Sequence, residues 1–169
     1  MEFNVRPIID SDRQWVRSLI RSHWGAEFVV AHGVVYHPHT LRGFLAETNS
    51  SEHLGLATYV IEKSECELVT LDSLRAGSGV GSALVQAVLQ EASDSGCSRL
   101  WCITTNDNRP AIRFYQRRGF RIVAVHPGAV ERSRILKPTI PSLGVDGVPI
   151  KDEVELEIRL KPASISAKE

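Results

Sequence analysis

A cluster of glycines between a predicted strand and a predicted helix restricts the fold of this chain more than any other feature. Gly77, Gly79 and Gly81 fall within five residues, and glycine tolerates positive φ and close approach of the backbone to a ligand. Apolar residues then recur at helical spacing from Val80 to Ala92, which indicates one buried helix face. Backbone N–H groups at the start of such a helix favour an anion. The segment therefore predicts a strand–loop–helix unit that holds a phosphate or pyrophosphate.

The residues before this unit predict antiparallel strands. Three strand patterns with short connections indicate a meander; they cover residues 43–47, 55–62 and 66–71. A strand over 3–9 and a helix that begins after the cap-type residues 10–12 come earlier. The pattern between residues 25 and 42 is irregular, so we predict no regular element there.

The residues after the unit predict strand–helix–strand connections. A buried strand over 100–103 and a strand over 120–125 flank a short helix that ends near Arg118. Residues 152–160 alternate apolar and polar side chains, as a half-buried strand does. Residues 127–150 hold four of the eight prolines and predict a long irregular loop. Parallel crossovers in this half and hairpins in the other predict a mixed α/β sheet.

Length and composition predict a single domain. The chain has 169 residues, of which 43% are hydrophobic and 24% charged, ordinary values for a globular protein. We assign residues 1–162 to this domain and residues 163–169 to a flexible tail. Twenty basic and twenty acidic residues give a formal net charge of zero. This balance argues against partners such as nucleic acid or an anionic membrane surface, which need a basic surplus.

Cysteine and histidine usage predicts neither a disulfide framework nor a metal site. The three cysteines form no CxxC pair, and the N-terminal segment lacks the apolar stretch of a signal peptide. No apolar run is long enough to span a membrane, so we expect a cytoplasmic protein. His37-Pro38-His39 presents two imidazoles without an acidic or thiol partner, and we expect no metal there.

The glycine segment can be compared with three phosphate-binding motifs. A P-loop requires a Gly-Lys pair, and no lysine is present here. A dinucleotide fingerprint requires Gly or Ala where this chain has Ser82 or Leu84, depending on the starting glycine. The pattern [Gln/Arg]-x-x-Gly-x-[Gly/Ala] remains, and the segment from Ala76 to Gly81 resembles it, which makes it similar to the pyrophosphate loop of GNAT acetyltransferases.

A second segment strengthens this resemblance. The run from Asn108 to Phe120 reads Asn-Arg-Pro-Ala-Ile-Arg-Phe-Tyr-Gln-Arg-Arg-Gly-Phe and begins 27 residues after Gly81. It resembles the GNAT signature Asn-x-x-Ala-x-x-Phe-Tyr-x-x-x-Gly-Phe. The two motifs in order, over residues 43–125, make the chain similar to the GNAT superfamily of acetyl-CoA-dependent acyltransferases. The resemblance implies an α/β fold whose mixed sheet splays open between its fourth and fifth strands, here 66–71 and 100–103.

The resemblance also implies which residues bind the cosubstrate, acetyl-CoA. The pantetheine arm would lie in the splayed gap and hydrogen-bond to the backbone near Leu71 and Ser73. The pyrophosphate would bind the loop, whose residues are Ala76, Gly77, Ser78, Gly79, Val80, Gly81 and Ser82. The family usually has Gln or Arg where Ala76 stands, so backbone N–H groups must carry most of this binding. Arg75 is expected to point elsewhere. Asn108 is either a helix cap alone or also a partner of pantetheine.

Three residues are candidates for the chemistry that the resemblance implies. Tyr115 is the candidate general acid for the leaving thiolate, or else a core residue like Phe114. The backbone N–H of Leu71 is the implied oxyanion donor. Glu67 is the candidate general base, because alternation would place it on the same strand face as Leu71. A solvated strand glutamate is the plain alternative, and Asp72 is a second candidate base.

We therefore expect an N-acetyltransferase that transfers acetyl directly from acetyl-CoA to a primary amine of a small molecule or peptide. No cysteine lies in a nucleophile arrangement, so no covalent intermediate is expected. A CoA-binding sensor or structural protein without turnover, and a GNAT that uses another acyl-CoA, are the alternatives. Tyr36 or a nearby histidine is a candidate acceptor contact. Residues 127–150 either shape the acceptor site or form a surface or oligomer contact, in a monomer or a homodimer.

Overall fold

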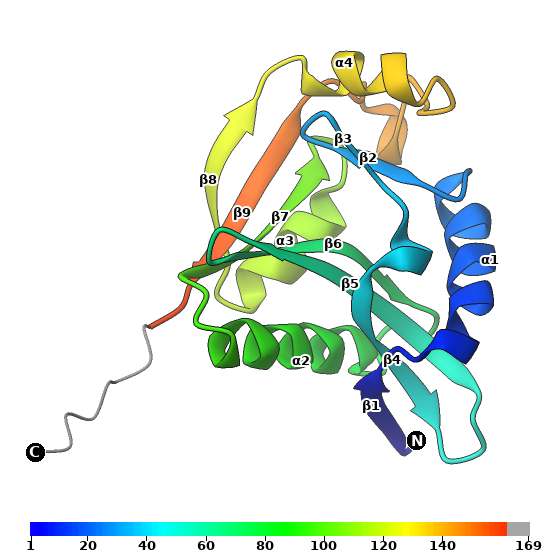
Figure 1. Cartoon of the computed structure of the whole chain (residues 1–169). Coiled ribbons are helices and arrows are strands. Elements are labelled where there is room, and N and C mark those ends of the chain that lie inside the picture. Colours follow the sequence, from blue (N-terminus) through cyan, green and yellow to red (C-terminus); the bar gives the residue numbers. More distant parts are fainter. Residues whose placement is uncertain (162–169) are drawn as a thin grey trace, which may run out of the picture.

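A seven-stranded mixed sheet organises the protein in the computed structural model, which describes residues 1–161 (Figure 1). The strand order across the sheet is β1-β4-β5-β6-β7-β9-β8. The strands are β1 (Phe3–Pro7), β4 (Arg42–Thr48), β5 (His53–Glu62), β6 (Glu65–Ser73), β7 (Arg99–Thr105), β8 (Arg121–His126) and β9 (Glu153–Arg159). The α/β class and the mixed sheet are confirmed. The predicted tail over 163–169 lies outside the described residues.

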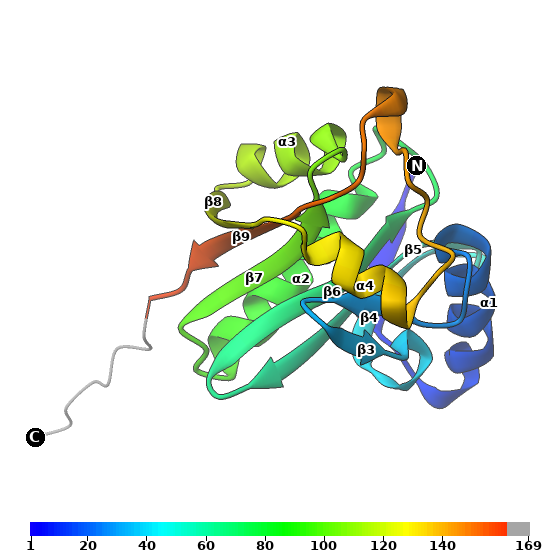
Figure 2. The same cartoon turned by 90° about the horizontal axis from the view of Figure 1, so that it is seen from above.

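Helices cover both faces of this sheet (Figure 2). The helices α2 (Val80–Asp94) and α3 (Arg109–Arg117) pack on one face over the larger apolar core. Helix α1 (Arg13–Trp24) packs on the other face over a smaller core around Leu56. No helix among residues 1–161 is both long and apolar enough to cross a membrane.

Strands β6 and β7 pair over a short stretch only. Their parallel pairing joins Cys66–Leu68 to Leu100–Cys102, although the strands continue to Ser73 and Thr105. Every other pairing in the sheet is antiparallel. The two strands part beyond Leu68, and this opens the sheet between the fourth and fifth strands in its order. The splayed sheet expected from the resemblance is confirmed.

Strand β6 carries a β-bulge at Val69. Thr58 pairs with Thr70 and Tyr59 with Leu68, so Val69 has no partner across the ladder. One extra residue reverses the alternation of side chains beyond it. Leu71 consequently packs against the core under α2, whereas Glu67 faces the α1 side. The prediction that Glu67 and Leu71 share a face is wrong for this reason.

The glycine cluster forms the expected turn into α2. Gly77 has φ 72° and Gly79, the N-cap of the helix, has φ 82°; side chains larger than glycine rarely adopt such values. Gly81 serves packing instead. A Cβ built on it would lie 3.2 Å from the Phe114 ring, so its lack of a side chain lets α2 approach α3.

Several regular elements lie in the two segments that the sequence pattern leaves irregular. Residues 25–42 contain a hairpin of β2 (Val29–Ala31) and β3 (Val34–Tyr36). Its two-residue turn is His32-Gly33, both with positive φ, as a type I′ turn requires. Residues 127–150 contain the helix α4 (Ala129–Leu136) and a short 3-10 turn at Val145–Gly147, so the prediction of an irregular loop is wrong over these ranges.

Candidate functional site

The gap between β6 and β7 forms a cleft with a volume of about 410 Å³. Its lining comes from both strands, from α3 and from the end of α1. The lining residues include Leu71 and Asp72 of β6, Thr104 of β7, Asn108 and Tyr115 at α3, and His23 and Trp24 of α1. A smaller cavity of about 230 Å³ shares Leu71, Ala111 and Tyr115 with the cleft and adds Ser73, Gly81 and Phe114. The cleft therefore adjoins a path that leads to the glycine turn.

Tyr115 belongs to both the core and the cleft. Its side chain is buried, and its ring lies 5.4 Å from that of Phe114 and 5.2 Å from that of Phe120, measured between centroids. Burial raises the pKa of its phenol well above the ordinary value. The phenol is therefore protonated throughout the physiological pH range, as a proton donor must be before it acts.

Asn108 caps α3. Its Oδ1 accepts a hydrogen bond from the backbone N–H of Ala111 at 3.3 Å, and Asn108 is the N-cap residue. The cap interpretation is confirmed. Because Asn108 also lines the cleft, the interpretation that adds a contact with pantetheine stays a prediction.

Arginines from α3 surround the glycine turn. A hollow of about 980 Å³ is lined by Ala76, Gly77 and Ser82, by the α3 segment, and by Val145 and Asp146. The α3 side supplies Arg109, Arg113, Arg117 and Arg118. The first three recur at a spacing of four residues and are exposed, which places them on one face of the helix. The spacing is visible in the sequence, and it is the signal that our sequence analysis missed.

Arg118 and Arg75 have different partners around this turn. Arg118 donates from Nε to the Ser82 hydroxyl at 2.9 Å, and its guanidinium lies 3.4 Å from the centroid of the Phe114 ring. Arg75 points away, as expected, and pairs with Glu52 at 2.8 Å. The basic side chains beside the glycine turn therefore come from the α3 segment.

Asp72 and His23 meet between β6 and α1. The bulge turns Asp72 toward α1, where His23 Nδ1 lies 3.4 Å from its Oδ1 and Trp24 Nε1 donates to it at 3.3 Å. Burial raises the pKa of Asp72. His23 is a candidate functional residue that the sequence did not indicate, because nothing in the helix pattern of α1 ties its end to β6.

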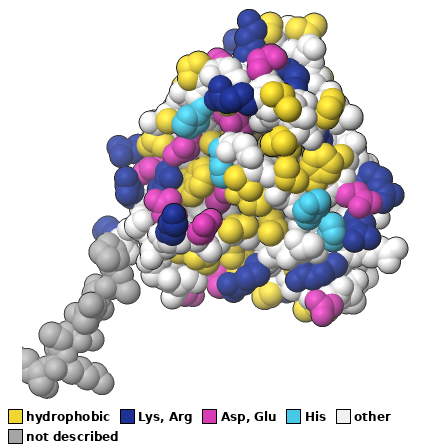
Figure 3. Space-filling model, turned by 45° about the horizontal axis from the view of Figure 1, so that its top comes forward, with side chains coloured by type: hydrophobic (Ala, Val, Ile, Leu, Met, Phe, Trp, Pro, Cys, Tyr) yellow, Lys and Arg dark blue, Asp and Glu magenta, His cyan; other side chains and the backbone are white. Residues whose placement is uncertain are grey.

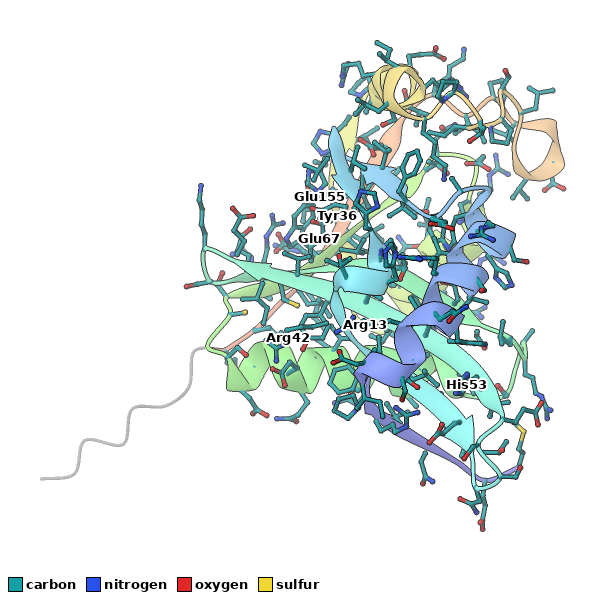
Figure 4. All side chains as sticks on the ribbon, turned by 45° about the vertical axis from the view of Figure 1, so that its right-hand side comes forward. Arg13, Tyr36, Arg42, His53, Glu67 and Glu155 are labelled. Atoms are coloured by element: carbon teal, nitrogen blue, oxygen red, sulfur yellow. The ribbon has the colours of Figure 1, made fainter. Side chains whose placement is uncertain are left out.

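Glu67 is held by the β2–β3 hairpin rather than by the cleft (Figure 4). Tyr36 Oη donates to its Oε2 at 2.5 Å, and His32 Nε2 lies 2.8 Å from its Oε1. Glu67, Tyr36 and His32 line a separate cavity of about 270 Å³ together with Trp101. The hydrogen bond with Glu67 raises the pKa of His32. Burial, followed by the contact with Glu67, raises that of Tyr36.

A second large cavity, of about 390 Å³, adjoins the cleft at His23 and Trp24. Its walls come from the end of α1, from β2, from α4 and from the segment that follows α4. Residues 127–150 thus contribute to a cavity beside the cleft. Residues 1–161 contain no group of three or more His, Cys, Asp or Glu side chains placed to hold a metal ion.

Comparison with known proteins decides the family. Residues 13–120 match the model of the acetyltransferase (GNAT) family. The chain belongs to the GNAT acetyltransferase family. Uncharacterized protein YdhI of Bacillus subtilis (strain 168) is 42% identical over 132 residues, which cover 78% of this chain and 82% of that protein. The family expected from the two sequence motifs is therefore confirmed.

Solved structures of GNAT proteins share the fold at low sequence identity. A Bacillus subtilis acetyltransferase in complex with CoA superposes with a TM-score of 0.68 at 16% identity, covering 95% of this chain and 100% of that chain. A GNAT family acetyltransferase from Elizabethkingia anophelis with acetyl-CoA bound gives a TM-score of 0.64 at 18% identity, covering 94% and 98%. The overall fold of this GNAT chain is thus one that solved acetyltransferase structures share.

The contact between His32 and Glu67 predicts a pH-dependent stability. Because the pKa of His32 is raised in the folded state, the contact contributes fully below pH ~6.5 and is lost as the pH rises through the raised value. His32→Asn keeps a residue that tolerates the left-handed turn but removes the cation. We expect this variant to lose about 1 kcal/mol of unfolding free energy at pH 6 and less at pH 9, measured by urea unfolding. His37→Asn is the control, and equal losses at both pH values would contradict the prediction.

Proposed function

We propose that this GNAT protein is an N-acetyltransferase that moves the acetyl group of acetyl-CoA directly onto a primary amine. The observation that carries the proposal is the sequence of adjoining spaces: the arginine-lined hollow at the glycine turn, the cleft with Tyr115, and the cavity beyond His23. The reaction needs a basic site for the CoA phosphates, then a site for the thioester, and then a site for the amine, and the three spaces lie in this order. Two solved relatives of the same fold, which hold CoA and acetyl-CoA, support the choice of cosubstrate.

The residues at the first two spaces suit CoA by their chemistry. Backbone N–H groups at the start of α2 favour phosphate oxygens, and the α3 guanidinium groups add charge-assisted hydrogen bonds. Near Leu71 and Ser73 the edge of β6 is not paired with β7. Its backbone groups are therefore available to an extended arm, which binds there as an added strand does.

The proposed reaction forms one C–N bond and breaks one C–S bond. The neutral amine attacks the thioester carbonyl, whose oxygen becomes negative and accepts a hydrogen bond from the Leu71 N–H. Collapse of this intermediate releases the CoA thiolate, which takes the Tyr115 proton. The amine proton passes to a base of the protein. The cysteines are not used: burial raises the pKa of Cys66 and of Cys102 to about 12, so neither is a ready nucleophile.

We propose His23, oriented by Asp72, as that base in preference to Glu67. His23 lines both the cleft and the adjoining cavity, so it borders the path of an incoming amine. Imidazole is the side chain best suited to accept a proton near neutral pH. Glu67 already accepts hydrogen bonds from the hairpin and lines a separate cavity. Asp72, whose carboxylate lies beside the imidazole, fixes its orientation.

The direct test of the function is a thiol-release assay with acetyl-CoA and a panel of amines, with mass spectrometry of the products. Release that depends on an amine, together with an N-acetylated product, supports the proposal. Binding of CoA without release on any amine favours the alternative of a sensor or structural protein. Faster release from another acyl-CoA than from acetyl-CoA favours a different acyl group.

Removal of the Tyr115 hydroxyl tests its role as general acid. Tyr115→Phe keeps the buried ring and should lower kcat at least ~10-fold, since general acid catalysis contributes on the order of 10² or more. The Kd for CoA should change little, because the hydroxyl is assigned to the leaving group. Calorimetric measurement of CoA binding to the same variant is the control. An unchanged kcat would reject the assignment.

Paired variants test the choice of base. We expect His23→Gln and Asp72→Asn each to lower kcat/KM at least ~10-fold at pH 7. His23→Gln should also change the shape of the pH–rate profile on its acidic side. Glu67→Gln is the matched comparison and should lower kcat/KM less than about threefold. A larger loss in Glu67→Gln than in His23→Gln would restore Glu67 as the base.

The arginines of α3 predict a charge-dependent affinity for CoA. Arg113→Ala removes one of the exposed guanidinium groups beside the glycine turn and should raise the Kd for CoA ~10-fold at low salt, equivalent to about 1.4 kcal/mol. The difference from the wild type should shrink in 0.5 M salt, because salt screens exposed charges. Arg121→Ala, which removes an exposed arginine of β8, is the control and should leave the Kd unchanged. Equal Kd values for Arg113→Ala and the wild type would place the phosphates elsewhere.

A further inference from the structure

The cavity beside the cleft points to a particular class of acceptor. We propose that the acceptor is a small primary amine on an apolar skeleton with one neutral polar group, and that this cavity between α1 and α4 binds it. The inference deepens the proposed function and rests on it, because an acceptor presupposes acetyl transfer. Four features of the cavity carry it: its size, its apolar walls, its free carboxylate and an unpartnered buried hydroxyl.

The size of the cavity limits the acceptor to a small molecule. The volume is about 390 Å³, and a water-sized group occupies ~30 Å³. About a dozen non-hydrogen atoms therefore fill it. The cavity adjoins the cleft at His23 and Trp24, so an acceptor bound in it would lie beside the cleft.

The walls of the cavity are mostly apolar. Their apolar side chains are those of Trp24, Val30, Val130, Ile140, Pro141 and Ile150. Figure 3 shows the molecule with its α4 end tilted toward the viewer. Hydrophobic side chains gather in the middle of this face, and charged side chains lie mainly around its edge. A second charge on the acceptor would have to leave water against these walls, at a high cost in free energy. The walls therefore disfavour polyamines, amino acids and sugars.

Glu153 offers a carboxylate to an ammonium group. It is 4% exposed and lines the cavity. It pairs across the strands with Thr105, which places it at the end of β7. The backbone N–H of His32 donates to its Oε2 at 3.0 Å, and no Lys, Arg or His side chain within residues 1–161 forms an ion pair with it. A buried carboxylate without a cationic partner favours a cationic ligand.

Lys137 does not fill this role or compete for it. Its Nζ donates to the carbonyl oxygens of Trp24 at 2.6 Å and of Phe28 at 3.1 Å. The ammonium also lies 5.5 Å from the centroid of the Phe28 ring. These contacts hold α4 against the end of α1. The Lys137 ammonium is thus already bound by the protein. A carboxylate on the acceptor would meet the like charge of Glu153, and this ammonium would not be free to pair with it.

Ser133 supplies the remaining polar feature. Its side chain lines the cavity and is almost fully buried, and its Oγ has no hydrogen-bond partner in the part of the chain that the structure describes. Leaving a buried hydroxyl unpaired is unfavourable. A ligand with an ether or hydroxyl oxygen would remove this cost. We therefore expect the acceptor to carry one neutral polar group besides its amine.

Calorimetric titration tests the cavity apart from turnover. The full-length protein is saturated with CoA, which cannot transfer acetyl, and titrated with 2-phenylethylamine, 2-phenylethanol, 4-methoxyphenethylamine and spermidine. We expect 2-phenylethylamine to bind at least 10-fold more tightly than 2-phenylethanol or spermidine. The methoxy compound should bind about fivefold more tightly than 2-phenylethylamine. Equal or tighter binding of spermidine, or no binding of either aromatic amine, would overturn the inference.

Two variants locate the binding. Glu153→Gln should weaken binding of 2-phenylethylamine at least 10-fold, whereas Glu91→Gln, on the surface of α2, should leave it unchanged. Ser133→Ala is a small change that should abolish the advantage of the methoxy compound without weakening 2-phenylethylamine. Thermal unfolding checks that each variant is folded. If Glu153→Gln does not fold, Ser133→Ala still tests the site. Unchanged affinities in both folded variants would overturn the site.

Thiol release with acetyl-CoA separates this inference from the proposed function. Acetylation of the aromatic amines in preference to spermidine, an amino acid and a short peptide supports both. Acetylation of spermidine or the peptide alone overturns the inference and leaves the proposed function intact. Binding of the aromatic amines without thiol release on any amine supports the cavity as an amine site and overturns the proposed function.

Discussion

The parting of β6 and β7 is the constraint on which the site depends. The two strands share hydrogen bonds over three residue pairs only, and beyond Leu68 their edges face a cleft instead of each other. Unpaired edges within a sheet are unfavourable unless something satisfies them. An extended arm that binds there as an added strand would satisfy them. The cores under α2 and α1 keep the two halves of the sheet in place around it.

The bulge at Val69 determines which side chains reach this cleft. Without it, Glu67 and Leu71 would lie on one face, as period-two alternation requires. With it, Leu71 turns to the α2 side and Asp72 meets His23 and Trp24 at the α1 side. Asp72 consequently lines the cleft, whereas Glu67 lines a separate cavity. Glu67, which precedes the bulge, holds the hairpin through Tyr36 and His32.

Sequence patterns predict the parts of this protein that depend on neighbours in the chain. The glycine turn, the apolar face of α2, the cap at Asn108 and the order of the main strands follow from local spacing and residue type. The bulge, the contact of His23 with Asp72 and the hairpin over Glu67 depend on residues that meet only after folding. The His32-Gly33 turn is also a less usual pair than Asn-Gly for a type I′ turn, so the hairpin carried a weak signal.

The buried ammonium of Lys137 has a consequence for the cavity between α1 and α4. It joins α4 to the backbone carbonyls of Trp24 and Phe28, 113 and 109 residues away in the chain. The helix and the end of α1 cannot separate without breaking charge-assisted hydrogen bonds of a buried group, each worth about 1.5–3 kcal/mol. The space between them is therefore bordered by these bonds, and a molecule too broad for it can enter only by breaking them.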